Sequence, residues 1–432
     1  MKKVLIITYY WPPTGGGGVQ RWLKFVKYIR EFGWEPIIYT PLNGESPVVD
    51  ETLLDEIPED VLTLKSKIWE PYSFYKIITG RKQNQRIYSG LINEKKEGFF
   101  QKLSVFIRGN FFIPDARKFW IKPAVKDLKS KIASLEVDLI ISTGPPHSTH
   151  LIAQGVLKNL SIPWIADFRD PWTKIDFYDQ LRLTSWGDKR HKKLELKVLN
   201  TASKVVTVSK SWVKDFEEIC KRSDIELITN GYDPEDFNNS SVDLDSKFSI
   251  CHVGSMNKDR NPVVLWKALS SLLSKKGLMD SLEIKLIGQI DFSVMESLEQ
   301  EGLKKFVTQI PHLAHKKAIN ELRKSQLLLL PINNTPNVAG VIPGKLFEYL
   351  AAKRPIICIG PEYCDSADIV RKTNAGEVFD YVQTDKLTQF ISNSFDKYQI
   401  NNLHQLSKNI EDYSRKKLIG DYCKMMDEIT KP

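Results

Sequence analysis

The stretch 337–355 contains the residues whose types and spacing point most directly to chemistry. A loop rich in glycine and proline leads into an apolar, helix-forming run that begins at Gly344 and Lys345. The first turn of a helix attracts anions, and a lysine there is unfavourable unless an anion is present. Glu348 lies one turn further on, where its carboxylate could accept hydrogen bonds from two ribose hydroxyls. This pattern predicts a site for a phosphorylated nucleoside.

A second group of polar residues follows the apolar run 248–253, which has the composition of a buried strand. Gly254 ends the run, and Arg260 stands six residues later in the loop. In an open parallel sheet, ligands bind at the carboxyl ends of the strands, so Arg260 is placed to meet a phosphate group. The alternative is that Arg260 is an ordinary solvated charge that binds no ligand. An Asn-Gly turn that starts at Asn230 marks the junction between the two halves of the chain.

Four consecutive glycines follow the first apolar run. Gly15, Gly16, Gly17 and Gly18 would let the backbone approach a ligand closely, and the helix expected after them offers free N–H groups. Dinucleotide-binding turns share this arrangement, but the third glycine of the G-x-G-x-x-G fingerprint is missing here. A dinucleotide oxidoreductase is therefore a distant alternative, and a flexible turn also remains open.

Three polar residues of the N-terminal half stand at the ends of other apolar runs. His147 follows one such run, and Asp167 and Arg169 leave another together. Charges in such places are usually paired or functional, so a catalytic role and a structural ion pair are both open. His147 and His150 have a spacing that could ligate a metal, but no third ligand is evident, and we expect no metal.

Length and composition limit the class of protein. The chain has 432 residues, 42% of them hydrophobic and 27% charged, which fits two α/β domains of about 200 residues each. No apolar run approaches the ~20 residues of a membrane-spanning helix, and the short run at the start predicts a strand rather than a signal peptide. The five cysteines are widely spread, as is typical of reduced thiols. We therefore expect a cytoplasmic location.

The positive charge of the chain is concentrated in residues 65–131. This segment contains 16 basic and 5 acidic side chains, a net charge of +11, together with twelve aromatic residues. Basic and aromatic residues in one segment favour an anionic membrane surface or an anionic acceptor. The best candidate is a helix in residues 94–110, which would dock at the inner face of the plasma membrane. An ordinary solvated face is the alternative, and no recognised motif indicates a nucleic-acid partner.

Apolar runs of strand length alternate with amphipathic helical stretches along the whole chain. Strands are expected at residues 4–8, 35–39, 137–142, 164–167, 204–208, 225–229, 248–253, 282–287, 326–331 and 355–359. This alternation predicts parallel sheets covered by helices on both faces. The predicted domains are 1–235, with a helical insertion at about 45–120, and 236–405, followed by a helix in 406–432 that packs back towards the first domain.

Taken together, these motifs resemble those of the retaining glycosyltransferases of family four, and the motif order is kept over nearly the whole chain. The turn at Asn230, followed by Phe237, is similar to the N-G-V-D-x-x-x-F junction motif of that family. Gly254 with Arg260 resembles its phosphate motif, and the stretch 345–355 resembles its nucleotide-binding helix. The Trp-Pro-Pro, glycine-loop and Asp-Phe-Arg-Asp-Pro-Trp segments are similar to those of bacterial surface-polysaccharide transferases.

Two positions depart from the family pattern. Ser255 stands where the family has a phosphate-binding arginine, so the contact to the diphosphate would rest on Arg260 with Lys345. Gly340 stands where the first glutamate of the family's E-x7-E motif is expected, which removes one side-chain contact to the sugar. These departures concern the identity of the donor more than the fold.

The resemblance implies a GT-B fold, with two Rossmann-like, doubly wound domains that face a central cleft. It implies a metal-independent retaining hexosyltransferase that moves a sugar from a nucleotide-diphosphate sugar to a lipid-linked or saccharide acceptor in cell-surface polysaccharide synthesis, with no cofactor. The implied donor-binding residues are Asn230, Gly254, Arg260, Gly344, Lys345 and Glu348. The implied acceptor-side loop is Gly15, Gly16, Gly17 and Gly18, and the candidate catalytic residues are His147, Asp167 and Arg169. A nucleotide-sugar epimerase of the same fold and an inactive binding subunit of a polysaccharide assembly are the alternatives.

Overall fold

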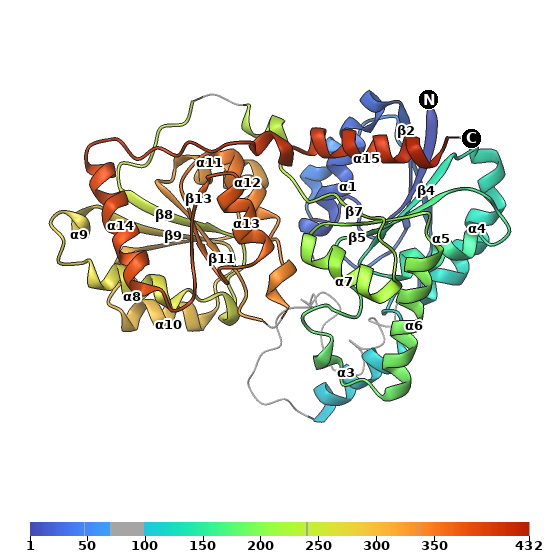
Figure 1. Cartoon of the computed structure of the whole chain (residues 1–432), viewed down its shortest axis with the longest axis horizontal. Helices are drawn as coiled ribbons and strands as arrows, with labels where there is room; N and C mark the ends of the chain where they lie inside the picture. Colours follow the sequence, from blue (N-terminus) through green and yellow to red (C-terminus); the bar gives the residue numbers. More distant parts are fainter. Residues whose placement is uncertain (47, 70–98, 239–240, 336, 432) are drawn as a thin grey trace. The chain divides into compact units, whose positions relative to one another are not determined.

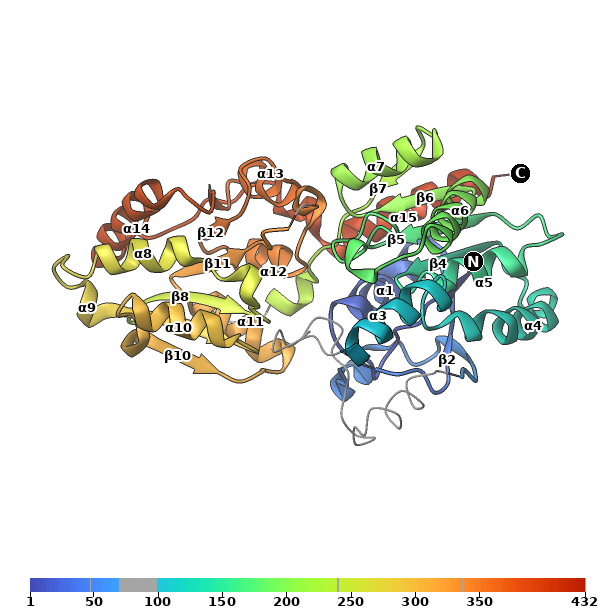
Figure 2. The same cartoon turned by 90° about the horizontal axis from the view of Figure 1, so that it is seen from below.

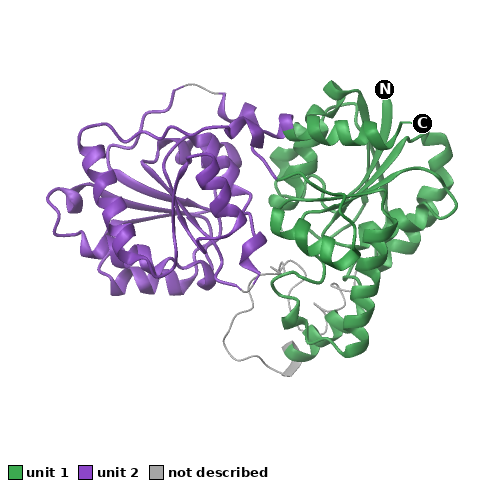
Figure 3. Ribbon diagram, in the orientation of Figure 1, with its two compact units in different colours: residues 1–229, 418–432 green, residues 230–417 purple. Residues whose placement is uncertain are grey.

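The computed structural model describes residues 1–46, 48–69, 99–238, 241–335 and 337–431. The chain divides into two compact units (Figure 3). Unit 1 consists of Met1–Thr229 and Leu418–Pro432, and unit 2 is Asn230–Lys417. The sequence had placed the two corresponding boundaries after residues 235 and 405.

Unit 1 is built on a parallel sheet of seven described strands in the order β3-β2-β1-β4-β5-β6-β7 (Figure 1). The strands are β1 (Lys2–Ile7), β2 (Trp34–Pro41), β3 (Leu62–Ser66), β4 (Leu139–Gly144), β5 (Trp164–Phe168), β6 (Lys204–Thr207) and β7 (Ile225–Leu227). Strand β3 lies inside the segment that was predicted to be an insertion. It extends the sheet next to β2, with Ile37 opposite Leu62.

Helices cover both faces of this sheet, so apolar residues occupy consecutive positions of β1. Leu5 and Ile7 face the core under α4, α5, α6 and α7, whereas Val4 and Ile6 face the core under α1 and α15. The helices of the unit are α1 (Gly17–Ile29), α3 (Phe99–Phe111), α4 (Lys118–Leu135), α5 (Ser148–Val156), α6 (Ser185–Thr201), α7 (Lys210–Cys220) and α15 (Arg415–Ile429). Figure 2 shows that α15 lies with the other helices of unit 1, although in the sequence it follows unit 2.

Helix α15 is part of the core of unit 1. Its Ile419, Tyr422 and Met426 are almost fully buried in the same cluster as the residues of α1, and the Tyr422 ring meets the Trp22 ring edge-on. Lys2 of β1 also pairs with Asp427, with 3.2 Å between Nζ and Oδ1. The first and last described elements of the chain therefore complete one hydrophobic core.

Unit 2 repeats the architecture with a parallel sheet of six described strands in the order β10-β9-β8-β11-β12-β13. The strands are β8 (Phe248–Val253), β9 (Leu282–Ile287), β10 (Val307–Ile310), β11 (Leu327–Pro331), β12 (Ile356–Ile359) and β13 (Gly376–Phe379). The helices are α8 (Val263–Ser271), α9 (Leu278–Ser281), α10 (Phe292–Gln300), α11 (His315–Lys324), α12 (Lys345–Ala352), α13 (Asp365–Lys372) and α14 (Thr384–Gln399). One core lies under α8, α10 and α14, and the other lies under α11, α12 and α13.

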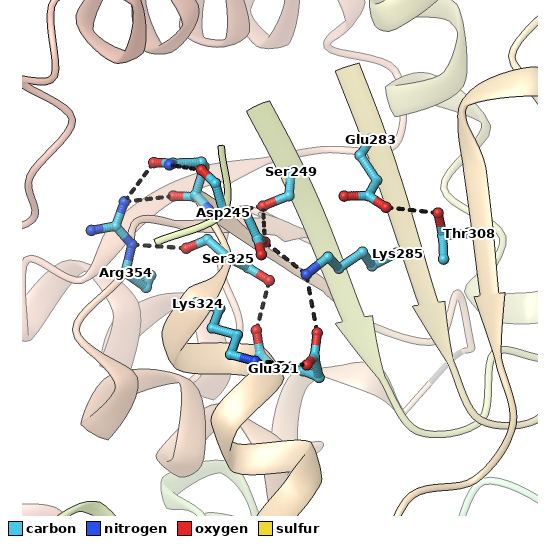
Figure 4. Close-up of polar contacts among 10 residues, drawn as sticks. Asp245, Ser249, Glu283, Lys285, Thr308, Glu321, Lys324, Ser325 and Arg354 are labelled. Carbon is cyan, nitrogen blue, oxygen red and sulfur yellow. Dashed lines mark hydrogen bonds and ion pairs between the residues drawn. The ribbon is translucent and has the colours of Figure 1, made fainter. Parts of the chain in front are cut away.

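A buried polar network holds the chain segment that leads into β8 (Figure 4). Lys285 of β9 is 8% exposed, and its Nζ lies 2.7 Å from Asp245 and 3.0 Å from Glu321 of α11. The same Asp245 carboxylate accepts a hydrogen bond from Ser249 at 2.6 Å. Two carboxylates therefore compensate one buried ammonium group, and the segment before β8 is anchored to the sheet at Asp245.

The strand orders place a topological switch point in each unit. In unit 1 the strands are added on one side of β1 up to β3 and on its other side from β4 onwards, and in unit 2 the same change occurs between β8 and β11. Loops at the carboxyl ends of such strand pairs are the usual ligand-binding position in doubly wound sheets. Most of the predicted site residues lie on the segments that follow β1, β4, β8 and β11, whereas Asp167 and Arg169 belong to β5 and its following loop, and Asn230 lies at the junction of the units. Among the helices that the structure describes, none has the length and apolarity needed to cross a membrane.

Candidate functional site

In unit 2 the candidate site begins with a glycine at the end of β8. Gly254 has φ +110°, a conformation that side chains rarely tolerate. A Cβ atom at this position would lie 2.8 Å from Nζ of Lys345 at the start of α12. The absence of a side chain at Gly254 therefore allows Lys345 to reach the end of β8.

Lys345 is held by a buried histidine that the sequence analysis had not singled out. Its Nζ lies 3.3 Å from Nε2 of His252, while Nδ1 of His252 lies 3.1 Å from the Leu329 carbonyl oxygen. Burial, and next the charge of Lys345, hold the pKa of His252 well below its usual value. The imidazole is therefore neutral, so Nδ1–H donates to Leu329 and Nε2 accepts from the lysine.

Two cations lie near each other at this switch point. Burial and, next, the nearby Arg260 guanidinium lower the pKa of Lys345 to about 7, and Glu348 opposes the shift. Nε of Arg260 donates to the side chain of Asn333, which follows β11, and NH1 lies 3.4 Å from the Ser255 carbonyl. Burial and a second cation both destabilise the charged form of a lysine, and an anionic ligand stabilises that form. Such a lysine is therefore well suited to bind an anion. Gly344 precedes α12 and is exposed, and no side chain caps the helix.

Glu348 is oriented by residues from two other elements. Its Oε1 lies 3.1 Å from Nε2 of His315, the first residue of α11. Nδ1 of His315 lies 3.8 Å from Oδ2 of Asp236, in the short helix that follows the junction turn. Glu348 is one of the residues predicted from the sequence, whereas its contact with His315 is visible only in the structure.

Asn230 is the first residue of unit 2 and is half-buried. Two residues later, the backbone N–H of Tyr232 donates to Tyr413 at 3.1 Å, and its carbonyl accepts from Arg415 at 2.8 Å. The two chain segments that connect the units are therefore hydrogen-bonded to each other. A contact between Asn230 and the donor stays a prediction.

In unit 1, Asp167 is a fully buried carboxylate with several donors. Its two oxygens accept hydrogen bonds from Arg21 at 3.1 and 3.3 Å, from Trp22 at 2.8 Å and from Thr143 at 3.0 Å. Both members of the ion pair are almost inaccessible, with 2% of the Arg21 side chain and none of the Asp167 side chain exposed. This geometry joins α1, β4 and β5, and it favours the structural ion pair over contact between Asp167 and a ligand.

Arg169 connects the two loops of the unit 1 switch point. Its guanidinium donates to the carbonyl oxygens of Gly18, in the glycine loop, and of Pro145, in the loop after β4. Burial lowers the pKa of Arg169, with the nearby Asp170 and Asp167 opposing the shift. Arg169 is therefore placed to fix the spacing of these loops.

The glycine loop itself is partly exposed. The Gly15 N–H donates to Val48 at 2.9 Å, and Gly16 has φ +89° directly before α1. Gly16 and Gly17 are exposed, and Gly18 is half-buried beneath Arg169. The amino end of α1 is therefore accessible at Gly16 and Gly17, as a loop that approaches an acceptor would require.

His147 lies in an aromatic stack at the end of β4. Its ring is parallel to that of Trp172, with centroids 4.8 Å apart, and its Nδ1 is buried without a hydrogen-bond partner among the described residues. Burial, and next the neighbouring His150, hold the pKa of His147 well below its usual value. His150 donates or accepts a 2.8 Å hydrogen bond with Ser142, and burial lowers its pKa to about 3. A neutral His147 whose buried ring nitrogen is unpaired in the described part of the chain has the chemistry of a hydrogen-bond acceptor or a base.

The structure thus gathers the predicted residues into two groups, one in each unit. In the part of the chain that it describes, no cluster of three potential metal ligands is found. The amino-terminal part of the predicted membrane helix, residues 94–98, lies outside the described residues.

Comparison with known proteins agrees with this architecture. The model of the family "Glycosyltransferase Family 4" matches residues 91–236, and no curated protein matches the chain. Anabaena Alr3699/HepE in complex with UDP-glucose superposes with a TM-score of 0.62 at 13% identity, covering 99% of this chain and 100% of that one. WaaG, a glycosyltransferase involved in lipopolysaccharide biosynthesis, gives 0.57 at 12% identity, with 98% and 96% covered.

A putative UDP-N-acetylglucosamine 2-epimerase from Listeria monocytogenes also superposes, with a TM-score of 0.58 at 10% identity and coverage of 99% and 96%. The predicted fold class is confirmed: the chain has two parallel-sheet α/β units and the GT-B fold. The family match and this fold together support a glycosyltransferase of family 4 with the GT-B fold.

Proposed function

We propose that the chain transfers a hexose from a nucleoside-diphosphate sugar to a lipid-linked or saccharide acceptor with retention, in the synthesis of a cell-surface polysaccharide. The observation that carries this proposal is the grouping of Lys345, Arg260 and Glu348 around Gly254 at the β8–β11 switch point. Two cations suit a diphosphate, and a carboxylate one helical turn away suits ribose hydroxyls.

The chemistry assigned to these residues is stabilisation of the leaving group. In the transfer, the bond from the anomeric carbon to the diphosphate oxygen breaks, a bond to an acceptor hydroxyl oxygen forms, and the hydroxyl proton passes to the released diphosphate. Negative charge develops on the diphosphate, where Lys345, Arg260 and the amino end of α12 offset it. These fixed charges can serve without a metal or another cofactor. In unit 1, His147 and the loop at Gly16 are the groups offered to the acceptor.

Activity is tested by two linked experiments. Thermal shift with UDP-, GDP-, ADP- and dTDP-sugars identifies the donor, and chromatography of reactions with candidate acceptors then follows transfer. A new glycoside, with release of the nucleoside diphosphate, supports the proposal. Conversion of the donor sugar in the absence of acceptor would favour an epimerase, and binding without turnover would favour an inactive subunit.

The diphosphate assignment predicts a selective loss of affinity in variants of Lys345 or Arg260. We expect Lys345→Met and Arg260→Met each to weaken binding of the nucleoside diphosphate by about tenfold, as for a charge-assisted hydrogen bond. Binding of the unphosphorylated nucleoside should change little. Calorimetric titration of both ligands makes the comparison, and equal losses for both would show that these residues contact something other than phosphate.

The pH dependence of the same titrations gives a check on Lys345. With its pKa near 7 in the unliganded site, the ammonium group is fully present at lower pH and is lost as the pH rises through 7. A bound diphosphate favours the charged lysine, so binding should take up a proton above pH 7. The Lys345→Met variant, titrated in the same buffers, should lack this uptake.

We also propose that unit 1 docks on anionic membranes through α3 and its neighbours. Leu103, Ile107 and Phe111 occur at four-residue spacing on α3 and are 41%, 38% and 61% exposed. Helix α3 is attached to the start of α6 near its own carboxyl end, where Asn110 accepts hydrogen bonds from Thr184 and donates to Arg182. An exposed apolar stripe on a basic segment is typical of helices that lie in a membrane interface.

Membrane docking is tested by sedimentation with vesicles. We expect binding to vesicles containing phosphatidylglycerol at low salt, with a fraction that high salt does not release because apolar side chains are inserted. Ile107→Ser combined with Phe111→Ser should remove this salt-resistant fraction. Phe292→Ser, which alters a 79% exposed aromatic residue of unit 2, is the matched control. Failure of the wild-type chain to bind anionic vesicles at low salt would contradict the proposal and favour a soluble acceptor.

A further inference from the structure

Three residues from three elements of unit 2 form a chain of polar contacts that ends at Glu348. Asp236 follows the junction turn, His315 begins α11, and Glu348 lies in the first turn of α12. Oδ2 of Asp236 lies 3.8 Å from Nδ1 of His315, and Nε2 of His315 lies 3.1 Å from Oε1 of Glu348. The side chains are 11%, 22% and 24% exposed in the same order, so the end at Glu348 is the most accessible to a ligand.

The direction of the hydrogen bond follows from the partners. A carboxylate is an acceptor, so Nε2 of His315 must carry the proton that it shares with Glu348. This contact engages Oε1, and no hydrogen bond from a described residue reaches the other oxygen, Oε2. On the opposite side of the ring, the carboxylate of Asp236 lies 3.8 Å from Nδ1 and helps to fix the orientation of the imidazole. A glutamate that would otherwise sample several rotamers is thereby held in one.

We propose that His315 is a positioning residue for the donor nucleotide, which orients Glu348 so that its second oxygen accepts from the ribose hydroxyls. This inference rests on the proposed function, because it assumes a nucleoside-diphosphate donor. Preorganisation reduces the entropy lost when the ligand binds, so His315 strengthens the ribose contact without touching the diphosphate. Asp236 acts one step further away, through His315.

The experiment compares a ribonucleotide with a ligand that lacks one ribose hydroxyl. UDP and its 2′-deoxy analogue, dUDP, are titrated calorimetrically into the wild-type chain and into His315→Ala. We expect the substitution to weaken UDP binding by about tenfold and dUDP binding by no more than about threefold. His315→Gln, whose amide can still donate to Glu348, should recover most of the affinity for UDP.

Two controls separate this role from a purely structural one. His404→Ala changes an exposed histidine of the same unit and should leave both affinities unchanged. The melting temperature of each variant is measured without ligand, and His315→Gln replaces His315→Ala if the alanine variant does not fold. Equal losses for UDP and dUDP, or no loss for either, would overturn the inference while leaving the donor proposal intact. Failure of the wild-type chain to bind any nucleoside diphosphate would overturn both.

Discussion

Replacing Asp167 with alanine is expected to lower the free energy of unfolding of unit 1 by about 3–5 kcal/mol. The substitution would leave the Arg21 guanidinium buried without its counter-charge, and removal of one member of a buried ion pair has costs of this size. It would also remove the acceptor for Trp22 and Thr143. Denaturation by urea, followed by tryptophan fluorescence, measures the loss. Nine of the ten tryptophans belong to unit 1, since Trp266 is the only one in unit 2.

The chain provides a matched control for this prediction. Asp60 also pairs with an arginine, Arg30, but its side chain is 75% exposed, and Arg30 keeps a second partner in Glu35. Exposed ion pairs contribute little to stability, so Asp60→Ala should leave the unfolding transition nearly unchanged. If Asp167→Ala were no more destabilising than Asp60→Ala, the buried pair would not be the structural element inferred here.

Glu348→Ala is expected to weaken binding of the donor nucleoside diphosphate by about 1.5–3 kcal/mol, roughly a 10- to 150-fold loss of affinity. The reason is the loss of a carboxylate that accepts hydrogen bonds from the ribose. Calorimetry on the folded variant measures the change. Glu377→Ala, which removes an exposed glutamate of β13, is the control and should bind as the wild-type chain does. If the affinity of Glu348→Ala were unchanged, α12 would not be the helix that binds the nucleotide.

The sequence predicted the interior of both sheets and missed three of their edges. Interior strands such as β1 and β11 are apolar at consecutive positions because helices cover both faces, and this composition is visible without a structure. Strands β3, β10 and β13 lie at sheet edges and are only partly buried. Their short, mixed sequences carry no apolar run, and their pairing depends on a neighbour already in place.

The candidate site divides in a similar way. Gly254, Arg260, Lys345 and Glu348 could be proposed because each stands at a recognisable strand end or helix start. His252 and His315 could not, because their partners lie 93 and 33 residues away and meet them only after the helices pack. Asp167 illustrates the same limit. Its sequence neighbour Arg169 suggested a local ion pair, whereas the observed partner is Arg21, 146 residues earlier.

The return of α15 to unit 1 has a consequence for how the chain is made. During synthesis, the strands of unit 1 and helix α1 leave the ribosome before any of unit 2, but the buried side chains of Ile419, Tyr422 and Met426 are translated after it. Until then, the face of the sheet beneath them stays open, with Trp22 and Phe25 exposed to solvent or to chaperones. Completion of the core of unit 1 therefore waits until unit 2 has been synthesised, and a chain that stops before Leu418 would leave this core unfinished.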